Sequence, residues 1–331
     1  FEESKSTFFK GEEPLKEGDL LIQKNLAKTI QKIAKQGAAG FYQGPVADQI
    51  LAEMKRGKGL ISRKDLEEYK VFKRDPVQIQ YKDYQVISMP PPSSGGVHIA
   101  QILQVLEGDD LSSMGFHSSS SIHLLAETMK KAYFDRAHYL GDPDFFRVPL
   151  EGLLAKAYAK KIRKVIKDDQ STPLKTLQGL VPYPQEPEST AHISIVDPWG
   201  NSVSTTQTIN YSFGSGVIAQ GTGIILNDEM DDFSIEDGLP NAFGLTGGKI
   251  NSIEGNKRPL SSMSPTIVTK NDKPIIIIGG AGGPRIITSV LQLIINIIDF
   301  DLSIEEAISA PRFHHQFLPE AIFVEKGFSN E

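Results

Sequence analysis

Cysteine is absent from this chain of 331 residues. Its absence excludes disulfide bridges, catalysis by a thiol, and zinc or iron–sulfur sites of the cysteine type. It does not decide between an oxidising and a reducing compartment, because a chain of this length can bury a substantial core without disulfides.

Long hydrophobic runs and an excess of basic residues are also missing. The most apolar stretches, 275–278 and 286–297, fall well short of the roughly 18 uninterrupted apolar residues of a membrane span. Acidic residues outnumber basic ones by 41 to 35, so the net charge of −6 disfavours a nucleic-acid surface. With 39% hydrophobic and 23% charged residues, the composition is that of a globular protein rather than a disordered or fibrous one.

The spacing of apolar residues predicts a mainly helical first half. In the segment 22–35 they recur every three or four positions, and Gly37 follows as a helix-ending glycine. Ser62 precedes Asp65 by three residues, which is typical of the start of a short helix. Further helices are predicted at 46–55, 98–106, 121–139 and 153–166.

The second half changes to the two-residue period of β-strands. Residues 192–197 and 202–209 alternate on either side of a turn at 198–201, which predicts a hairpin. Residues 265–269 and 274–278 predict a second hairpin. The remaining predicted elements are a strand with a kink or turn inside 77–87 and helices at 286–297 and 303–309.

This order of elements indicates an α+β fold of packed layers. Helices followed by antiparallel hairpins and more helices fit a sandwich better than a parallel sheet with crossover helices. Four prolines make the segment 170–188 unsuitable for a helix or an inner strand, and we expect an exposed linker there.

Thr190 stands where this linker runs into the first predicted hairpin strand. An isolated threonine at such a place is usually only the first residue of a strand. A catalytic role would require Thr190 to become a chain terminus. A threonine hydroxyl is a weak nucleophile unless a base lies beside it, and a free α-amine on the same residue supplies one. The reference pKa of that amine, about 7.7–8.0, suits a base at working pH.

Two polar clusters follow the first hairpin. The loop 227–232 carries four carboxylates in six positions but lacks the central glycine and final glutamate of an EF-hand, so no metal site is predicted. It is either a solvated acidic turn or a pocket for a substrate ammonium. The pair Ser261-Ser262 is either ordinary turn chemistry or a hydrogen-bonding site for a carboxylate.

A glycine-rich segment at 279–285 joins a predicted strand to a predicted helix. Adjacent glycines allow backbone N–H groups to point at one spot near a helix N-terminus, where an oxyanion or a phosphate would be stabilised. The glycine spacing fits neither a dinucleotide-binding loop nor a P-loop, so no nucleotide cofactor is predicted.

Seven sequence motifs, taken in order, resemble those of the γ-glutamyltranspeptidase family of self-processing N-terminal-nucleophile hydrolases. Each motif alone is weak evidence, whereas seven in the right order are highly specific. They lie at 89–96, 139–145, 189–204, 226–234, 256–268, 282–288 and 310–316.

The resemblance implies that the chain is a precursor that cleaves itself between Ser189 and Thr190. Residues 1–189 would then form the C-terminal part of a large subunit, and residues 190–331 the small, catalytic subunit. The two subunits would interlock as a heterodimer in one four-layer αββα sandwich. Thr190 would be the nucleophile, and Thr208 would hydrogen-bond and orient it.

The resemblance also assigns binding roles toward a γ-glutamyl amino acid. Asn210, Glu229 and Asp232 match the positions that hold the substrate α-amino group. The family often has glutamine where Glu229 stands, so this pocket would carry more negative charge. Ser261 and Ser262 match the pair that binds the α-carboxylate.

The N–H groups of Gly282 and Gly283 match the oxyanion hole of the family. Phe243 stands where a lid tyrosine often lies, so a hydrogen bond that gates the pocket is expected to be absent. Family large subunits begin well upstream of Phe1, in a region that holds a carboxylate-binding arginine, and small subunits extend beyond Glu331. The resemblance therefore implies a chain truncated at both ends.

The function implied is cleavage of the γ-glutamyl amide bond of glutathione and related compounds through a γ-glutamyl-threonine ester. Water, an amino acid or a peptide would accept the acyl group, with no cofactor and no metal. A periplasmic or secreted location is implied, although no leader precedes Phe1 in the sequence. The alternatives are an inactive fragment or binding module of the same fold, and an acylase of the same superfamily.

Overall fold

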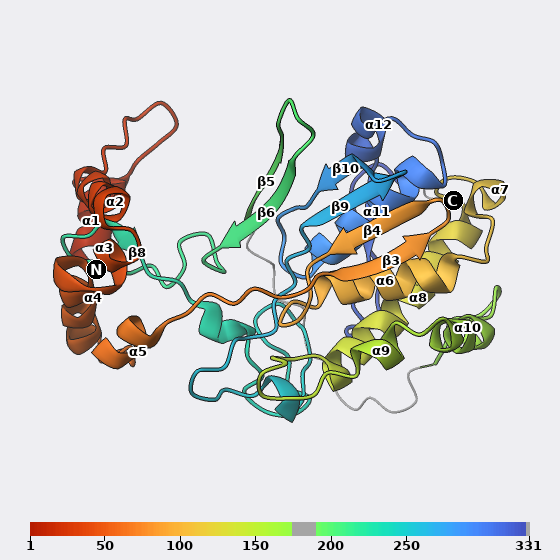
Figure 1. Ribbon diagram of the computed structural model, residues 1–331, viewed down its shortest axis with the longest axis horizontal. Helices are drawn as coiled ribbons and strands as arrows, with labels where there is room; N and C mark the ends of the chain where they lie inside the picture. Colours follow the sequence, from red (N-terminus) through yellow and green to blue (C-terminus); the bar gives the residue numbers. More distant parts are fainter. Residues whose placement is uncertain (174–189, 329–331) are drawn as a thin grey trace. The chain divides into compact units, whose positions relative to one another are not determined.

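The structure is a computed structural model that describes residues 1–173 and 190–328. The described residues form two compact units (Figure 1). The first unit comprises Phe1–Lys73 and Ile209–Asp228, and the second comprises Arg74–Thr208 and Glu229–Glu331. The chain leaves the first unit, builds most of the second, and returns to the first for a single short segment.

Helices and two small two-stranded sheets make up the first unit. Its elements are α1 (Glu2–Phe8), β1 (Phe9–Lys10), β2 (Glu13–Pro14), α2 (Lys24–Gln36), α3 (Ala39–Tyr42), α4 (Gly44–Gly57), α5 (Arg63–Glu68), β7 (Ile218–Ala219) and β8 (Ile224–Ile225). Its core consists of Val46, Ala47, Ile50, Leu66 and Ala219. The returning segment 209–228 therefore contributes to the core of the unit where the chain begins.

Local sequence signals set the ends of two helices in this unit. The Ser62 hydroxyl accepts from the Asp65 N–H, and the Asp65 carboxylate accepts from the Ser62 N–H, so α5 begins with a full capping box. Helix α2 ends at Gly37, which has a φ of 62°. The apolar face of α2 is not packed, because Ile30 and Ile33 are exposed and Thr29 is its buried residue.

A four-stranded antiparallel sheet of order β10-β9-β4-β3 is the centre of the second unit. Its strands are β3 (Val77–Tyr81), β4 (Tyr84–Ser88), β9 (Thr266–Lys270) and β10 (Lys273–Ile278). Two tight hairpins therefore meet along β4 and β9, and Val86 lies opposite Val268. Both residues are buried, so the sheet has one continuous apolar face.

Helices cover that face of the sheet, behind it in Figure 1. The innermost, α6 (Gly95–Leu106), is almost entirely buried and packs on β3, β4, α8, α10 and α11. The other helices are α7 (Leu111–Met114), α8 (Ser119–Tyr139), α9 (Leu150–Leu153), α10 (Lys156–Val165), α11 (Arg285–Ile298) and α12 (Ile304–Ser309). Short elements complete the unit: η1 (Glu229–Asp232), η2 (Lys249–Asn251), β11 (Phe313–His314) and β12 (Phe323–Val324).

A separate hairpin, β5 (Thr190–Val196) and β6 (Ser202–Thr208), contacts β10. Its polar face is the one held in place, because the Ser194 and Ser204 hydroxyls donate to the carbonyls of Ile277 and Ile278 at 2.8 and 2.9 Å. Its apolar face is open, and Ile193 and Ile195 are 51% and 52% exposed. The hairpin in the described residues thus lacks a hydrophobic covering.

The α+β class and both second-half hairpins are confirmed, and every ladder between the named strands of residues 1–173 and 190–328 is antiparallel. The predicted turn inside 77–87 separates β3 from β4. The helix predicted at 153–166 is confirmed as α10, which begins only at Lys156 because the backbone of Ala155 is extended, and Leu153 ends the separate short helix α9. Most of the predicted linker at 170–188 lies outside the described residues. The described residues show one helix layer, the four-stranded sheet and the hairpin rather than four complete layers.

Candidate active site

Thr190 and Thr208 lie opposite each other at the open end of the β5–β6 hairpin. The register pairs them directly, and their hydroxyl oxygens are 3.4 Å apart. Both residues are only partly buried, so a substrate could reach them. The turn at 197–201 fixes this pairing, because the Asp197 carboxylate accepts from the N–H groups of Trp199 and Asn201.

His192 follows Thr190 on the same face of β5. Its Nδ1 lies 2.8 Å from the Thr206 hydroxyl and its Nε2 lies 3.1 Å from the Ser194 hydroxyl. Partial burial lowers the pKa of His192, which favours the neutral imidazole. The ring is thus held by two hydroxyl groups, as a structural histidine would be.

Gly279 provides the space into which the His192 ring packs. A Cβ atom on Gly279 would overlap the ring, whereas a Cβ atom on Gly280 would meet nothing within 4 Å. The glycine-rich segment therefore has a packing role at its first position, next to the hairpin that carries Thr190.

We expect Gly279→Ala to displace His192 and loosen the hairpin from β10, whereas Gly280→Ala should behave as the wild type. The expected loss of stability is about 1–3 kcal/mol, the range for overpacking a filled site. Urea unfolding of the two variants measures this. Equal stabilities would show that the hairpin is not seated by this contact.

Gly282 and Gly283 carry the turn that leads into α11. Their φ angles are +121° and +53°, a region that L side chains rarely adopt. Their carbonyls accept from the N–H groups of Arg285 and Ile286 at 3.0 and 3.1 Å. Within residues 1–173 and 190–328, neither glycine N–H donates a hydrogen bond, so both remain available for an oxyanion.

Phe243 packs directly on this turn. Its ring would lie 3.0 Å from a Cβ atom on Gly283, and the side chain is only 4% exposed. The surrounding loop is held by Asn241, whose Oδ1 accepts from the N–H groups of Phe243 and Leu245, and by Gln316, which donates to the Phe243 carbonyl. The predicted lid residue is thus brought against the predicted oxyanion hole.

Ser261 and Ser262 lie on a segment that is fastened to the proline-rich motif. Ser94 N–H donates to the Ser261 carbonyl at 2.8 Å, and Ser261 N–H donates to the Pro92 carbonyl at 2.9 Å. The Ser261 hydroxyl accepts from the Met263 N–H, while the Ser262 side chain is 9% exposed. The motif 89–96 therefore acts as a structural crossing that fixes the serine pair.

Glu229 and Asp232 begin and end the short 3-10 helix η1 in the second unit. The Asp232 carbonyl accepts from Asn251 Nδ2 at 2.8 Å, which anchors the end of η1. Asn210 belongs to the first unit, where it has a φ of +74°, is 6% exposed, and donates from Nδ2 to the Asp228 carbonyl at 3.3 Å. Ser189 lies outside the described residues.

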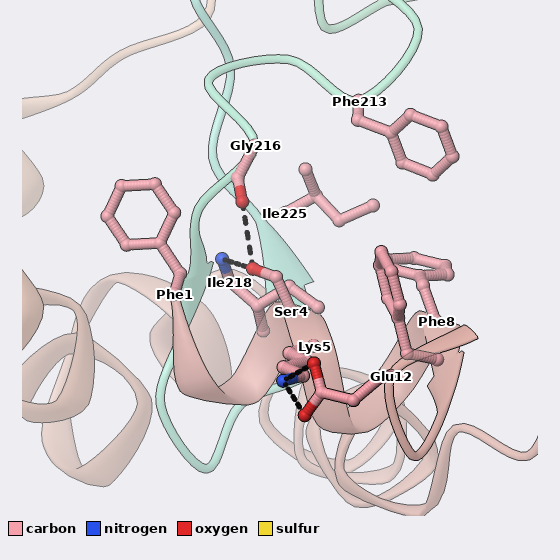
Figure 2. Close-up of a pocket in the computed structure, with 10 residues that line it drawn as sticks. Phe1, Ser4, Lys5, Phe8, Glu12, Phe213, Gly216, Ile218 and Ile225 are labelled. Atoms are coloured by element: carbon pink, nitrogen blue, oxygen red, sulfur yellow. Dashed lines mark hydrogen bonds and ion pairs between the residues drawn. The ribbon is translucent and has the colours of Figure 1, made fainter. Parts of the chain in front are cut away.

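A pocket in the first unit contains none of the predicted site residues (Figure 2). It has a volume of about 380 Å³ and is lined largely by apolar side chains such as Phe8, Phe213 and Ile225. Two of its lining residues are joined by a hydrogen bond, which the Ser4 hydroxyl donates to the Gly216 carbonyl at 2.8 Å. Elsewhere in the described part of the chain, no group of three or more His, Asp or Glu side chains could hold a metal, and no helix is long and apolar enough to cross a membrane.

Sequence reasoning missed two residues of α8 that reach the site. The Tyr133 hydroxyl donates to the Pro284 carbonyl at 2.6 Å, directly after the glycine pair. One turn along the helix, Arg136 donates to the Leu260 carbonyl and to Ser262 Oγ at 3.0 and 3.4 Å. The only sequence signal was their spacing of three residues, which places both side chains on one side of the helix. Core residues have the same spacing, so the signal does not distinguish a site residue from a core residue.

The chain is similar to known proteins over nearly its whole length. A family model described as Gamma-glutamyltranspeptidase matches residues 1–331. A "Glutathione hydrolase proenzyme" of Escherichia coli (strain K12) is 51% identical over 99% of the chain and 57% of its own length. The chain thus spans just over half the length of the curated relatives it matches.

Two solved structures are similar to this one. The cephalosporin acylase from Bacillus halodurans has a TM-score of 0.78 and 29% identity, over 93% of this chain and 53% of that chain. The γ-glutamyltranspeptidase of Helicobacter pylori has a TM-score of 0.52 and 49% identity, over 54% of this chain and 51% of that chain. Each of these structural similarities covers more than half of this chain and is therefore not confined to single motifs.

Proposed function

Because the chain belongs to the γ-glutamyltranspeptidase family, we propose that it is part of a self-processing γ-glutamyl transferase and hydrolase whose nucleophile is Thr190. The observation that carries the proposal is the pairing of Thr190 with Thr208 at the start of a strand. A threonine at this place gains a base only if the chain is cut immediately before it.

Cleavage would begin with attack of the Thr190 hydroxyl on the carbonyl carbon of Ser189. The hydroxyl proton passes to the departing Thr190 nitrogen, so an ester replaces the peptide bond and the α-amine becomes free. Water then hydrolyses the ester, which returns the proton to the Thr190 oxygen and leaves residues 1–189 and 190–331 as two subunits. The new amine is the base for the next reaction.

Turnover would repeat this chemistry on a γ-glutamyl amide. The freed amine accepts the Thr190 hydroxyl proton as the oxygen attacks the γ-carbonyl carbon, and the N–H groups of Gly282 and Gly283 stabilise the oxyanion. The C–N bond breaks, the amine product leaves with the proton, and a γ-glutamyl-threonine ester remains. Water or an amino-acid amine then takes the acyl group. A single oxyanion donor contributes about 2.7–4 kcal/mol in such reactions.

Substrate selection would depend on both charges of the amino-acid head group. The α-amino group would lie near Asn210, Glu229 and Asp232, and the α-carboxylate would accept from Ser261 and Ser262. Fixing the head group at both ends sets the γ-carbonyl beside Thr190, and such positioning can supply several kcal/mol of the barrier. Phe243 would wall the oxyanion hole by packing rather than by a gating hydrogen bond.

We further propose that the complete enzyme is an αββα sandwich of two interlocked subunits. The open apolar face of the β5–β6 hairpin supports this, because Ile193 and Ile195 would be covered by a second helical layer. The first subunit would end at Ser189 and the second would begin at Thr190. Glutathione and related γ-glutamyl compounds are the proposed substrates, and a periplasmic or secreted location is proposed from the family.

The acylase of Bacillus halodurans makes acylase activity the second candidate. The two activities differ in whether the acyl group carries an α-amino group. The two carboxylates of η1 favour an amino-bearing substrate, because their negative charge attracts an ammonium group and offers no such attraction to an uncharged acyl chain.

Intact-mass measurement of the purified chain is expected to show two pieces that break between Ser189 and Thr190. The processed chain should cleave γ-glutamyl-4-nitroanilide at least about 30-fold faster than glutaryl-4-nitroanilide, which lacks the α-amino group and with it an ion-pair interaction of about 2–5 kcal/mol. The reverse preference would identify an acylase, and an uncut chain with no turnover would identify a binding module.

A further inference from the structure

Arg136 of α8 is a buried cation beside the proposed carboxylate site. Its side chain is only 4% exposed, and its guanidinium donates to three acceptors. Nε donates to the Ser94 hydroxyl at 3.0 Å, and Nη2 donates to the Leu260 carbonyl at 3.0 Å and to Ser262 Oγ at 3.4 Å. All three acceptors are uncharged.

No carboxylate of the described residues lies within 4.0 Å of the Arg136 guanidinium. Burial lowers the pKa of Arg136, and the attraction of Asp232 opposes that effect from farther away. A buried charge is costly unless it is paired and hydrogen-bonded. Arg136 is hydrogen-bonded but has no adjacent counter-charge, which is the condition of a site that awaits an anion.

The position of Arg136 connects the parts of the proposed site. Tyr133, three residues earlier on the same face of α8, donates to the Pro284 carbonyl after the oxyanion glycines. Arg136 holds the serine segment from the same helix, through Leu260 and Ser262. One rigid helix thus fixes both the oxyanion turn and the carboxylate-binding serines.

We propose that Arg136 is a positioning residue for the substrate α-carboxylate, acting through the Ser262 hydroxyl. Because Nη2 donates to Ser262 Oγ, the Ser262 hydroxyl proton is left to donate to the carboxylate. The guanidinium also supplies the positive charge that the serine pair lacks. This inference deepens the proposed function and depends on it for the identity of the anion.

The competing explanation is that Arg136 only braces α8 against the serine segment. A brace would affect every substrate alike, whereas a carboxylate-positioning residue affects only substrates that carry the carboxylate. Three 4-nitroanilides separate the two: γ-glutamyl has both groups, glutaryl keeps the carboxylate, and 4-aminobutanoyl keeps the amine.

We expect Arg136→Met to lower kcat/KM for the γ-glutamyl and glutaryl anilides about 30- to 100-fold and to change the 4-aminobutanoyl anilide less than about threefold, the range for a charge-assisted hydrogen bond. Arg136→Lys should restore part of the loss for the same two substrates, because it keeps the charge but not the fork geometry. An equal loss on all three anilides would overturn the proposal.

Ser262→Ala provides an independent arm if Arg136→Met does not fold. It should show the same selectivity, and adding Arg136→Lys to it should cost nothing further with the carboxylate substrates. Additive losses would overturn the proposal. If the wild type turns over none of the anilides, the proposed function fails, and calorimetry with glutarate and with 4-aminobutanamide, which has no carboxylate, tests Arg136 separately. Glutarate binding that Arg136→Lys weakens would support the site, and the absence of glutarate binding to the wild type would reject it.

Discussion

Thr190→Ala is expected to keep the chain whole and to abolish turnover of γ-glutamyl-4-nitroanilide, with a loss of about 10⁴-fold or more. Alanine removes the oxygen that would both cut the chain and take the acyl group. The partner of that oxygen, the Thr208 hydroxyl, is 3.4 Å away across the hairpin. Intact mass follows processing, and release of 4-nitroaniline follows turnover.

Conservative changes on the same hairpin sharpen this test. Thr190→Ser keeps the oxygen and should still give two pieces. Thr208→Val keeps the shape of the side chain but removes its hydroxyl, and should slow both reactions by about 10–100-fold, as expected for a lost orienting hydrogen bond. Thr205→Ala is the matched control, because Thr205 pairs with Ile193 on the opposite face. Cleavage of the Thr190→Ala chain at the same bond would disprove self-processing by Thr190.

The regular elements could be predicted because their signals are local. Ser62 and Asp65 are three residues apart and form the capping box that starts α5. The pairing of Thr190 with Thr208 follows from the turn at 197–201, since an antiparallel register extends outward from its turn. The family resemblance named Thr208 as the partner of Thr190, and the register of the hairpin places the two residues opposite each other.

Long-range packing could not be predicted in the same way. Alternation in β5 and β6 shows that the hairpin has two faces, but not that its polar face is the one fastened to β10. The contact of Phe243 with Gly283 joins positions 40 residues apart, and no local pattern encodes it. The start of α10 was predicted three residues too early, because Ala155 is extended without a glycine or proline to mark it.

The burial of a charged side chain, Arg136, was the other feature that the sequence alone could not predict. The helix 121–139 was predicted, but a lone arginine among its residues is typical of an exposed face. Only the folded chain shows that Arg136 is buried against Ser94 and Ser262. The physical reason is that apolar periodicity reports which side of a helix is buried, not which acceptors lie on the neighbouring segment.

Mild acid is expected to destabilise the second unit strongly, because three buried histidines stay neutral in the folded chain and take up protons when it unfolds. Burial lowers the pKa of His98 and His314 to about 3 and that of His315 to about 4. The neighbouring cations Arg136, Arg285 and Lys130 act in the same direction on the three rings respectively, whereas Glu127 and Glu320 oppose the effect at His315.

The sign follows from where each ring binds its proton. In the unfolded chain a histidine titrates near pH 6.5, whereas these three stay neutral in the folded chain until pH 3–4. Below pH 6.5 the unfolded chain therefore binds more protons, and stability falls as the pH falls. Each ring should reduce the free energy of unfolding by about 2 kcal/mol between pH 7.5 and pH 5.0.

Urea unfolding at pH 7.5 and pH 5.0 measures this loss, which should total about 6 kcal/mol for the three rings. The interval lies above the titration of most carboxylates, so their lowered pKa values contribute little to the difference. His314→Gln should remove about a third of the pH dependence, whatever it does to stability at pH 7.5, since Thr288 and Gln316 still offer its side chain hydrogen bonds. A pH dependence that His314→Gln leaves unchanged would show that His314 does not remain neutral in the folded chain.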